Sequence, residues 1–252
     1  MEHRKNVVNF KNSQSVNALK ELYDINVDLL PHYGDINWNK HSMVVQNVTT
    51  ISRILYLDQL YRKIITVPGV ICEFGVQWGT TLSQLINLRS IYEPFNHSRV
   101  IYGFDTFEGF PSIHQKDGKE CIIGDFTTLD NYEMILDKIL TLIEVFPPMS
   151  HIKKFDLIKG DVINTVEKWL DDNPHVVISM AILDMDLYEP TKFVLEKIKH
   201  RFTKGTIIAF DELNCKAFPG ETIALDETLG LNNLRLQRSP LHNFGAWAVY
   251  GD

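Results

Sequence analysis

The segment from Val70 to Gly79 (VICEFGVQWG) constrains the fold of this chain more than any other part of the sequence. It begins with a short run of strand-forming residues that contains one acid, Glu73, near its end, and two glycines follow. Gly75 allows the backbone to turn tightly, and Gly79 allows the next helix to pack close to whatever lies in the turn. Ligands bind at the carboxyl ends of the strands in open α/β sheets. The segment therefore predicts a strand, a ligand-binding turn and a helix.

The same turn departs from the dinucleotide-binding fingerprint. That fingerprint has glycines at its first, third and sixth positions, and Gln77 stands where the second glycine belongs. A pyrophosphate pressed against the backbone is therefore disfavoured, and we expect a ligand without phosphates.

The composition indicates one α/β domain, alone or with an appendage. Of the 252 residues, 44% are hydrophobic and 23% are charged, so the chain can bury a full core. The longest apolar runs, such as Val176 to Leu183, are far shorter than a membrane span, and the first residues lead into no apolar signal core. We expect a cytoplasmic protein that does not bind membranes.

Charge and cysteine content exclude further classes of partner. The formal net charge of -7 argues against nucleic acid, because no cluster of Lys and Arg offsets the repulsion from phosphates. Cys72, Cys121 and Cys215 are odd in number and widely spaced, which suits neither a disulfide framework nor a cysteine zinc site. We expect reduced thiols and a small or neutral substrate.

Strand and helix patterns alternate along the chain after about residue 65. The alternation predicts a mostly parallel sheet that is covered by helices on both faces, with the most apolar strand, residues 176–184, at its centre. The other expected strands are 70–74, 99–105, 155–159 and 206–210, with a closing pair at 234–236 and 246–250; the expected helices are 79–91, 129–145, 162–170 and one after Pro190.

The first 65 residues are expected to be helical, because apolar residues recur at helical spacing between Val48 and Ile65. They form either a cap over the carboxyl edge of the sheet or an oligomer contact. Residues 66–252 then form the sheet domain.

Acidic residues lie at the ends of the first two expected strands, at Glu73 and Asp105, and just after the third. Asp105 ends the second strand, where an acid usually binds both ribose hydroxyls of a nucleoside, although it would also serve as a cap for the following loop. Asp161 follows Gly160 after the third strand, and it lies either on the ligand side or at the N-cap of the next helix.

Strands four and five also end in acids, namely Asp184-Met-Asp and Asp211-Glu212. If these strands are parallel and adjacent, Asp184, Asp211 and Glu212 lie close together. Proteins commonly neutralise the repulsion between such carboxylates by binding a hard divalent cation. Oxygen ligands favour Mg²⁺, Mn²⁺ or Ca²⁺ over zinc. Such a cation would hold two neighbouring hydroxyls of a substrate and lower the pKa of one. The alternative is that these acids cap helices or pair with Lys and Arg.

Several segments together resemble the macrocin O-methyltransferase family of class I S-adenosylmethionine (SAM)-dependent methyltransferases. They are EFGVQWG at 73–79, YGFDTFEGFP at 102–111, LDMDLYEPT at 183–191 and FDEL at 210–213, and FPGETIA at 218–224 extends the match. The resemblance covers roughly residues 55–252. It implies a Rossmann-like sheet of seven strands with the last one antiparallel, a methyltransferase domain over 66–252, and a homo-oligomer. Members of the family methylate sugar hydroxyls of macrolides and other glycosylated natural products, and some use Mg²⁺.

The resemblance also implies roles for the residues named above. Glu73, Gly75 and Gly79 would line the methionine end of SAM, Asp105 would bind its ribose, and Asp161 would lie near its adenine; Thr80 and Thr106 complete the expected cofactor set. Asp184, Asp211 and Glu212 fall on the metal-ligand positions, although the family often has a second Asp where Glu212 stands. SAM has no pyrophosphate, which explains the missing glycine of the turn.

Methyl transfer requires that the acceptor hydroxyl is held in line with the methyl group and loses its proton. Our candidate base is His242, which precedes the last strand; the alternatives are His114, His41 and, with a metal bound, Asp184. Tyr188 and Trp38 are candidate sugar-stacking groups, each with a core or surface alternative. We expect the substrate to lie under the N-terminal segment and the loop of residues 106–125.

The predicted function is methylation of a hydroxyl of a sugar or glycosylated natural product. A catechol or phenol O-methyltransferase is the first alternative, followed by a NAD(P)-dependent oxidoreductase and a noncatalytic SAM-binding module. The incomplete glycine fingerprint argues against the oxidoreductase. The acids after strands four and five argue against the module, because buried carboxylates are costly without a metal or partner.

Overall fold

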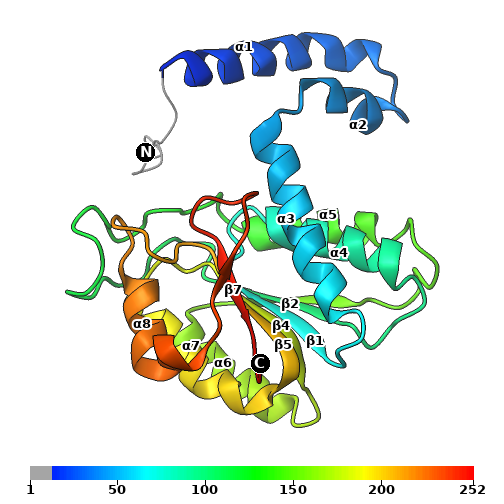
Figure 1. Ribbon diagram of the computed structural model, residues 1–252. Helices are drawn as coiled ribbons and strands as arrows, with labels where there is room; N and C mark the ends of the chain where they lie inside the picture. Colours follow the sequence, from blue (N-terminus) through cyan, green and yellow to red (C-terminus); the bar gives the residue numbers. More distant parts are fainter. Residues whose placement is uncertain (1–12) are drawn as a thin grey trace. The chain divides into compact units, whose positions relative to one another are not determined.

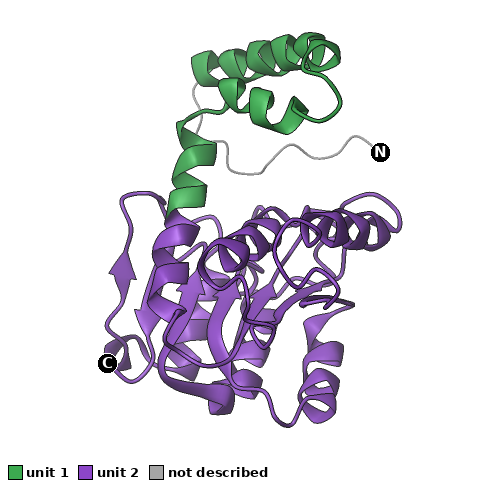
Figure 2. Ribbon diagram, turned by 90° about the vertical axis from the view of Figure 1, so that its right-hand side faces the viewer, with its two compact units in different colours: residues 1–55 green, residues 56–252 purple. Residues whose placement is uncertain are grey.

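A computed structural model describes residues 13–252, and its contacts divide the chain into two compact units. The N-terminal unit comprises residues 1–55 and the sheet unit residues 56–252 (Figure 2). Residues 1–12 of the expected helical segment lie outside the described residues. The boundary between the units falls within helix α3 (Val48–Ile64).

The N-terminal unit is helical, as the sequence pattern predicts. It contains α1 (Ser13–Leu29), η1 (Leu30–His32), α2 (Trp38–His41), η2 (Ser42–Val45) and the first part of α3. None of the described residues up to position 55 is buried. Between residues 13 and 252, no helix is long and apolar enough to cross a membrane.

The sheet unit contains a seven-stranded, mostly parallel sheet. Its strands are β1 (Val70–Phe74), β2 (Ile101–Asp105), β3 (Phe155–Lys159), β4 (Ile178–Leu183), β5 (Phe202–Phe210), β6 (Gln237–Arg238) and β7 (Ala246–Val249). They lie in the order β3-β2-β1-β4-β5-β7-β6, so the apolar β4 is central, as predicted. β7 is antiparallel to β5 and to β6, whereas β1 to β5 pair in parallel.

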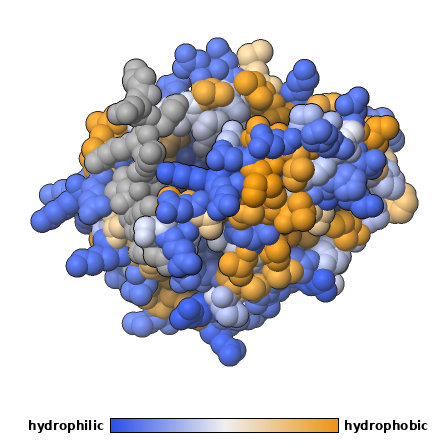
Figure 3. Space-filling view, turned by 90° about the horizontal axis from the view of Figure 1, so that it is seen from above, coloured by the Kyte–Doolittle hydropathy of each residue, from blue (hydrophilic) through white to orange (hydrophobic). Residues whose placement is uncertain are grey.

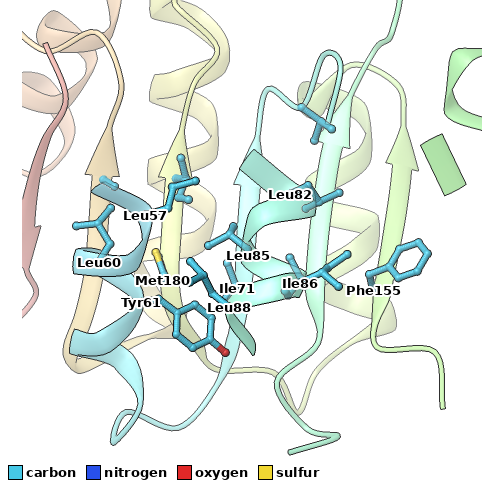
Figure 4. Packing of buried hydrophobic residues seen from close by; sticks show 14 of the residues in the cluster. Leu57, Leu60, Tyr61, Ile71, Leu82, Leu85, Ile86, Leu88, Phe155 and Met180 are labelled. Carbon is cyan, nitrogen blue, oxygen red and sulfur yellow. The ribbon is translucent and has the colours of Figure 1, made fainter. Parts of the chain in front are cut away.

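Helices cover both faces of the sheet, as expected (Figure 1). They are α4 (Thr80–Tyr92), α5 (Tyr132–Ile143), α6 (Val162–Asp172), α7 (Tyr188–Ile198) and α8 (Gly220–Thr228). Side chains of α3, α4 and α5 form the core on one face, and those of α6, α7 and α8 form the core on the other. In Figure 4, Leu57 and Leu60 of α3 and Leu85 of α4 lie over Ile71 of β1 and Met180 of β4. The second part of α3 is therefore part of the core of the sheet unit.

Two elements near the C-terminus differ from the sequence expectations. α8 was not predicted, because it has nine residues, starts at a turn-like Pro-Gly pair and buries few apolar side chains. The first strand of the closing pair lies at Gln237–Arg238 and not at residues 234–236. Only two residues of this strand pair with β7, so the strand is too short to show a pattern of alternating apolar residues.

A buried ion-pair cluster joins α4, the end of α5 and the start of β3. Glu144 accepts from Arg89 and, at 2.9 Å, from the ammonium of Lys154. Arg89 also donates to the carbonyl of Lys154 at 2.6 Å. All three residues are at least 95% buried. The pairing satisfies charges that would otherwise be costly in the interior.

Candidate active site

The turn between β1 and α4 is pressed against the end of β4. Gly75 has φ +93°, and a Cβ at this position would lie 1.8 Å from the carbonyl oxygen of Asp184. Two further hydrogen bonds fix the junction: Gly75 N–H donates to Phe104 O at 2.9 Å, and Asp184 N–H donates to Phe74 O at 2.8 Å. Only glycine fits there, because both the space and the backbone conformation exclude a side chain.

The remaining residues of the turn have different surroundings. Glu73 is 1% exposed and lies one residue before the end of β1, between β2 and β4. Gly79 precedes α4 with φ +75°, and a Cβ there would lie 2.3 Å from a methyl group of Leu136 in α5. The close approach at Gly79 is therefore with a neighbouring helix. Thr80 is exposed at the first position of α4.

Asp105 is bound to the backbone of the turn. Its Oδ2 accepts from Val76 N–H at 2.7 Å and from Gln77 N–H at 2.8 Å, and its Oδ1 accepts from Phe107 N–H at 2.5 Å. A carboxylate oxygen accepts about two hydrogen bonds, so Oδ2 is fully used. Oδ1 keeps capacity for a further hydrogen bond, and the expected contact of Asp105 with the ribose hydroxyls of SAM stays a prediction.

Thr106 and Asp161 also make local hydrogen bonds. The Thr106 hydroxyl donates to Gly109 O at 2.8 Å, which closes the turn after β2. Asp161 is the N-cap of α6, where its Oδ1 accepts from Ile163 N–H at 3.0 Å. The capping alternative for Asp161 is thus confirmed, whereas its contact with adenine stays a prediction.

The two roles of Asp161 can be separated by substitution. Asp161→Ala is expected to lower the free energy of unfolding by about 1 kcal/mol, because the cap is lost, whereas Asp161→Asn keeps it. If Asp161 also contacts the adenine, both variants bind SAM more weakly than the wild type. Urea denaturation and SAM calorimetry measure the two effects. An Asn variant with wild-type SAM affinity would exclude the adenine contact, and an Ala variant of wild-type stability would exclude the cap.

The acids after β4 and β5 lie at one edge, as predicted. β4 and β5 are adjacent and parallel, and Asp211 N–H donates to Leu183 O at 3.1 Å. Two acids that were given no role in the sequence interpretation join them. Asp186 is 9% exposed and Glu221 is fully buried, with its Oε1 accepting from Glu212 N–H at 3.1 Å.

The electrostatics of this edge show that its carboxyl groups interact. Burial raises the pKa of Asp186 well above its usual value, and the charges of Glu212 and Asp211 add to the shift. Burial likewise raises the pKa of Glu221, with further contributions from the acids of the β4 and β5 turns. These two buried acids therefore retain their protons at higher pH than exposed acids do. The signals in the sequence were the second acid of the Asp-Met-Asp motif and the acid after Pro219-Gly220.

The backbone around these turns is strained at residues other than glycine. Gln77, Phe107, Asp186 and Asn214 have φ between 47° and 62° and follow β1, β2, β4 and β5 respectively. Such conformations cost energy and tend to gather at functional sites. They mark the carboxyl edge of the sheet as the candidate active site.

His242 lies at this edge, but both of its ring nitrogens have partners. Nδ1 accepts from Gly245 N–H at 2.7 Å, and Nε2 lies 3.4 Å from Oδ1 of Asp211. A neutral ring that accepts at Nδ1 carries its proton on Nε2, which then faces Asp211. The ring also packs against Tyr56 of α3, with 5.1 Å between the centroids. In this arrangement His242 orients Asp211, and its basic nitrogen is occupied.

The other candidate base and sugar-stacking side chains also have neighbours in the structure. Tyr188 was a candidate for sugar stacking, but it is 7% exposed and its ring packs on His114, with 4.8 Å between the centroids. Stacking on a sugar is therefore blocked, and the core alternative holds for Tyr188. His114 is correspondingly engaged on Tyr188. His41 and Trp38 belong to the N-terminal unit, where His41 packs on Tyr33.

The expected metal ligands do not form a complete site as they are placed. Among residues 13–252, no three His, Cys, Asp or Glu side chains stand so that they could hold a metal ion. The edge nevertheless places several carboxyl groups beside the glycine turn that follows β1. That combination suits the removal of a proton from a hydroxyl beside a bound cofactor.

Known proteins share both the sequence features and the fold. The family model of macrocin-O-methyltransferase (TylF) matches residues 35–250. A crystal structure of CalS11, a calicheamicin methyltransferase, is 35% identical, with a TM-score of 0.84 and 98% of each chain covered. Its apo structure, described as a TDP-rhamnose 3′-O-methyltransferase of calicheamicin biosynthesis, is 34% identical, with a TM-score of 0.77 and 97% of each chain covered.

A more distant structure shows the same fold. The O-methyltransferase NovP is 18% identical, with a TM-score of 0.54 and 79% of each chain covered. No curated protein sequence matches the chain.

Proposed function

Because the chain belongs to the macrocin O-methyltransferase family, and is thus a SAM-dependent O-methyltransferase, we propose that it methylates a hydroxyl of a sugar or glycosylated natural product. The observation that carries this proposal is the likeness to CalS11, which extends over nearly the whole chain and whose description names a nucleotide-linked sugar. The candidate active site supports it, since several carboxyl groups lie there beside the turn after β1.

In the proposed reaction the acceptor oxygen forms a bond to the methyl carbon while the bond from that carbon to sulfur breaks. SAM supplies the activated methyl group and leaves as S-adenosylhomocysteine. The acceptor loses its hydroxyl proton, and the protein must hold the oxygen in line with the methyl group. Glu73 carries a buried carboxyl group one residue before the end of β1, and such a group suits the positively charged amino group of the methionine moiety.

The acids that follow β4 and β5 form what we call the acidic edge. We propose that one of its carboxylates accepts the hydroxyl proton, with Asp184 as the candidate. What supports this choice over His242 is the pair of contacts that occupies the ring nitrogens of His242. His242 then acts on Asp211, which it holds in one orientation. Gly245 is required for this, because a Cβ at position 245 would lie 2.6 Å from Nδ1.

We further propose that a hard divalent cation, Mg²⁺ in the first instance, binds to Asp184, Asp211 and Glu212. Support comes from the donor set, which consists of oxygen ligands from two adjacent strand ends, and from the repulsion that a cation would relieve. Because these side chains do not surround a common point, binding requires them to rotate. When bound, the cation would hold two neighbouring hydroxyls and favour the ionised form of one.

We propose that a second copy of the chain covers the N-terminal unit. This unit has no buried residue between positions 13 and 55, and its exposed apolar side chains include Tyr23, Ile36, Trp38 and Val44. Hydrophobic residues gather on the face that Figure 3 shows. Helices without a core do not offset the entropy lost on ordering, so a partner copy would supply that core.

Light scattering tests the proposed partner copy. It is expected to show more than one chain per particle, and a monomer at micromolar concentration would contradict the proposal.

Calorimetry tests the cofactor and the metal together. We expect binding of SAM and no binding of NAD, each measured with and without Mg²⁺. Binding of NAD but not SAM would overturn the proposed function. If SAM-dependent activity is the same with Mg²⁺ and with EDTA, only the proposed metal requirement is contradicted.

A further inference from the structure

The long loop between β2 and α5 reaches across the edge of the sheet to α7 and α8. Residues 114–118, which we call the loop tip, make its contacts with these helices. The backbone at Gly118 comes so close to Ala217 that a Cβ on Gly118 would lie 1.7 Å from the carbonyl oxygen of Ala217. The tip is therefore fitted to the segment between β5 and α8.

Asp117 binds the start of α7. Its Oδ1 accepts from Tyr188 N–H at 2.7 Å, and its Oδ2 accepts from His114 N–H at 2.7 Å. Leu187, the N-cap of α7, provides no side-chain cap, so Asp117 supplies this hydrogen bond from a distant part of the chain. A Cβ on Gly220, the first residue of α8, would lie 2.5 Å from Oδ1 of Asp117. Three segments thus meet at one carboxylate.

Lys116 adds a second tie from the loop tip. Its ammonium lies 3.0 Å from the Tyr188 hydroxyl and pairs with Glu227 of α8. Lys192 of α7 makes the same two contacts, at 3.1 Å to the Tyr188 hydroxyl and 2.8 Å to Glu227. Hydrogen bonds from these two lysines lower the pKa of Glu227 to about 2, so it is ionised at neutral pH. Lys116 joins the loop to the helices, whereas Lys192 joins only helix to helix.

The residues that the loop tip contacts are close in sequence to the buried acids Asp186 and Glu221. Tyr188 follows Asp186 by two residues, and Gly220 directly precedes Glu221. Asp117 therefore contacts the backbone next to both acid-bearing turns.

We propose that Lys116 and Asp117 are positioning residues that latch the loop tip onto α7 and α8 and so hold the loop and the acidic turns in place for the acceptor. The latch concerns the same site as the proposed function. Its kinetic test rests on that function, because the test measures methyl transfer. Its charges are about one-third exposed, at 33% for Lys116 and 34% for Glu227. Salt therefore screens the tie of Lys116, and its loss affects loop order more than global stability.

A matched pair of lysine variants tests the latch by hydrogen exchange of the free enzyme. Lys116→Met is expected to increase the exchange rate of amides within residues 112–124 by up to about fivefold, the range of one exposed ion pair. Lys192→Met removes the same kinds of contact with Glu227 but leaves the loop exchange unchanged. Equal exchange in the two variants, or no change in Lys116→Met, would overturn the role of Lys116.

Asp117→Asn tests the second tie, with the exposed Asp226→Asn of α8 as control. An amide accepts through one oxygen only, so one of the two backbone N–H groups loses its partner. We expect loop exchange to rise at least about tenfold in Asp117→Asn, as for a lost hydrogen bond to a charged group, and not in the control. Unchanged exchange would overturn the role of Asp117.

Kinetics separate positioning from a merely structural role. With an acceptor that the wild type methylates, the KM for that acceptor should rise in Lys116→Met while the Kd for SAM stays within about twofold, the scatter between variants of equal function. A Kd for SAM that rises in parallel with KM would contradict the latch. If the wild type fails to bind SAM, the proposed function fails, whereas hydrogen exchange still decides whether the latch exists.

Discussion

Gly75→Ala is expected to weaken SAM binding at least about thirtyfold, which corresponds to about 2 kcal/mol. The added Cβ would lie 1.8 Å from the carbonyl oxygen of Asp184, so the turn or the end of β4 must move. Overpacking of this kind costs about 1–3 kcal/mol, and the positive φ adds roughly 1–2 kcal/mol for a residue with a side chain. Calorimetry with SAM and thermal unfolding measure the two consequences.

Gly124→Ala is the matched control. Gly124 has φ +84°, which is close to that of Gly75, but a Cβ there meets no atom within 4 Å. The control therefore isolates the cost of the backbone conformation, about 1–2 kcal/mol, from that of the clash. If both variants bind SAM equally well, the close approach of the turn to β4 does not shape the cofactor site. If Gly75→Ala does not fold, Asp105→Asn replaces it, since Asp105 binds the same turn through Val76 and Gln77.

Glu144→Gln is expected to lower the free energy of unfolding by about 3–5 kcal/mol, the cost of breaking a buried ion pair from one side. Glu144 pairs with both Arg89 and Lys154, and both cations are almost fully buried. Without its charge, two cations face each other in the interior. Urea denaturation of the purified variant measures the loss.

Glu167→Gln provides the comparison on the surface. Glu167 pairs with Lys197, but their side chains are 57% and 37% exposed, so water screens the pair. We expect a change below about 1 kcal/mol. A loss of similar size in the two variants would mean that burial does not determine the contribution of the Glu144 cluster.

The strands that are buried on both faces could be predicted from the sequence, because burial leaves a continuous apolar pattern. Residues 70–74 of the fully buried β1 were predicted with the bounds that the structure shows, and the fully buried β4 was placed at the centre. Residues 155–159 were also predicted with the observed bounds, although β3 is an edge strand in which only Phe155 is buried. The closing strand was predicted at 246–250, and β7 spans Ala246–Val249. α8 escaped prediction because its start reads as a turn and its apolar face is short.

At the candidate site, sequence position located the acids but did not determine their contacts. Asp184, Asp211 and Glu212 were expected at one edge because parallel strands end together, and the topology places them there. The partners of Asp105 depend on how closely the turn after β1 approaches the end of β2, which no local pattern records. The same is true of Asp117, which accepts from the N–H of Tyr188, 71 residues away in the chain.

His242 illustrates the same difference for a single side chain. Its place before the last strand suggested that it would reach the cleft, and the structure does bring it to Asp211. The tautomer, however, follows from the N–H of Gly245, which the sequence alone does not orient. The contacts of His242 with Asp211 and Gly245 therefore support the proposal that it orients an acid, and its role as the base stays an untested prediction.

Mass spectrometry of methyl transfer to a panel of acceptors tests the central claim most directly. The enzyme, SAM and Mg²⁺ would be incubated with nucleotide sugars, glycosides and catechols, with EDTA in parallel reactions. The account predicts that a nucleotide sugar or glycoside gains the mass of one methyl group and that S-adenosylhomocysteine accumulates. Methylation of catechols alone, or of none of the sugars while SAM is bound, would contradict it.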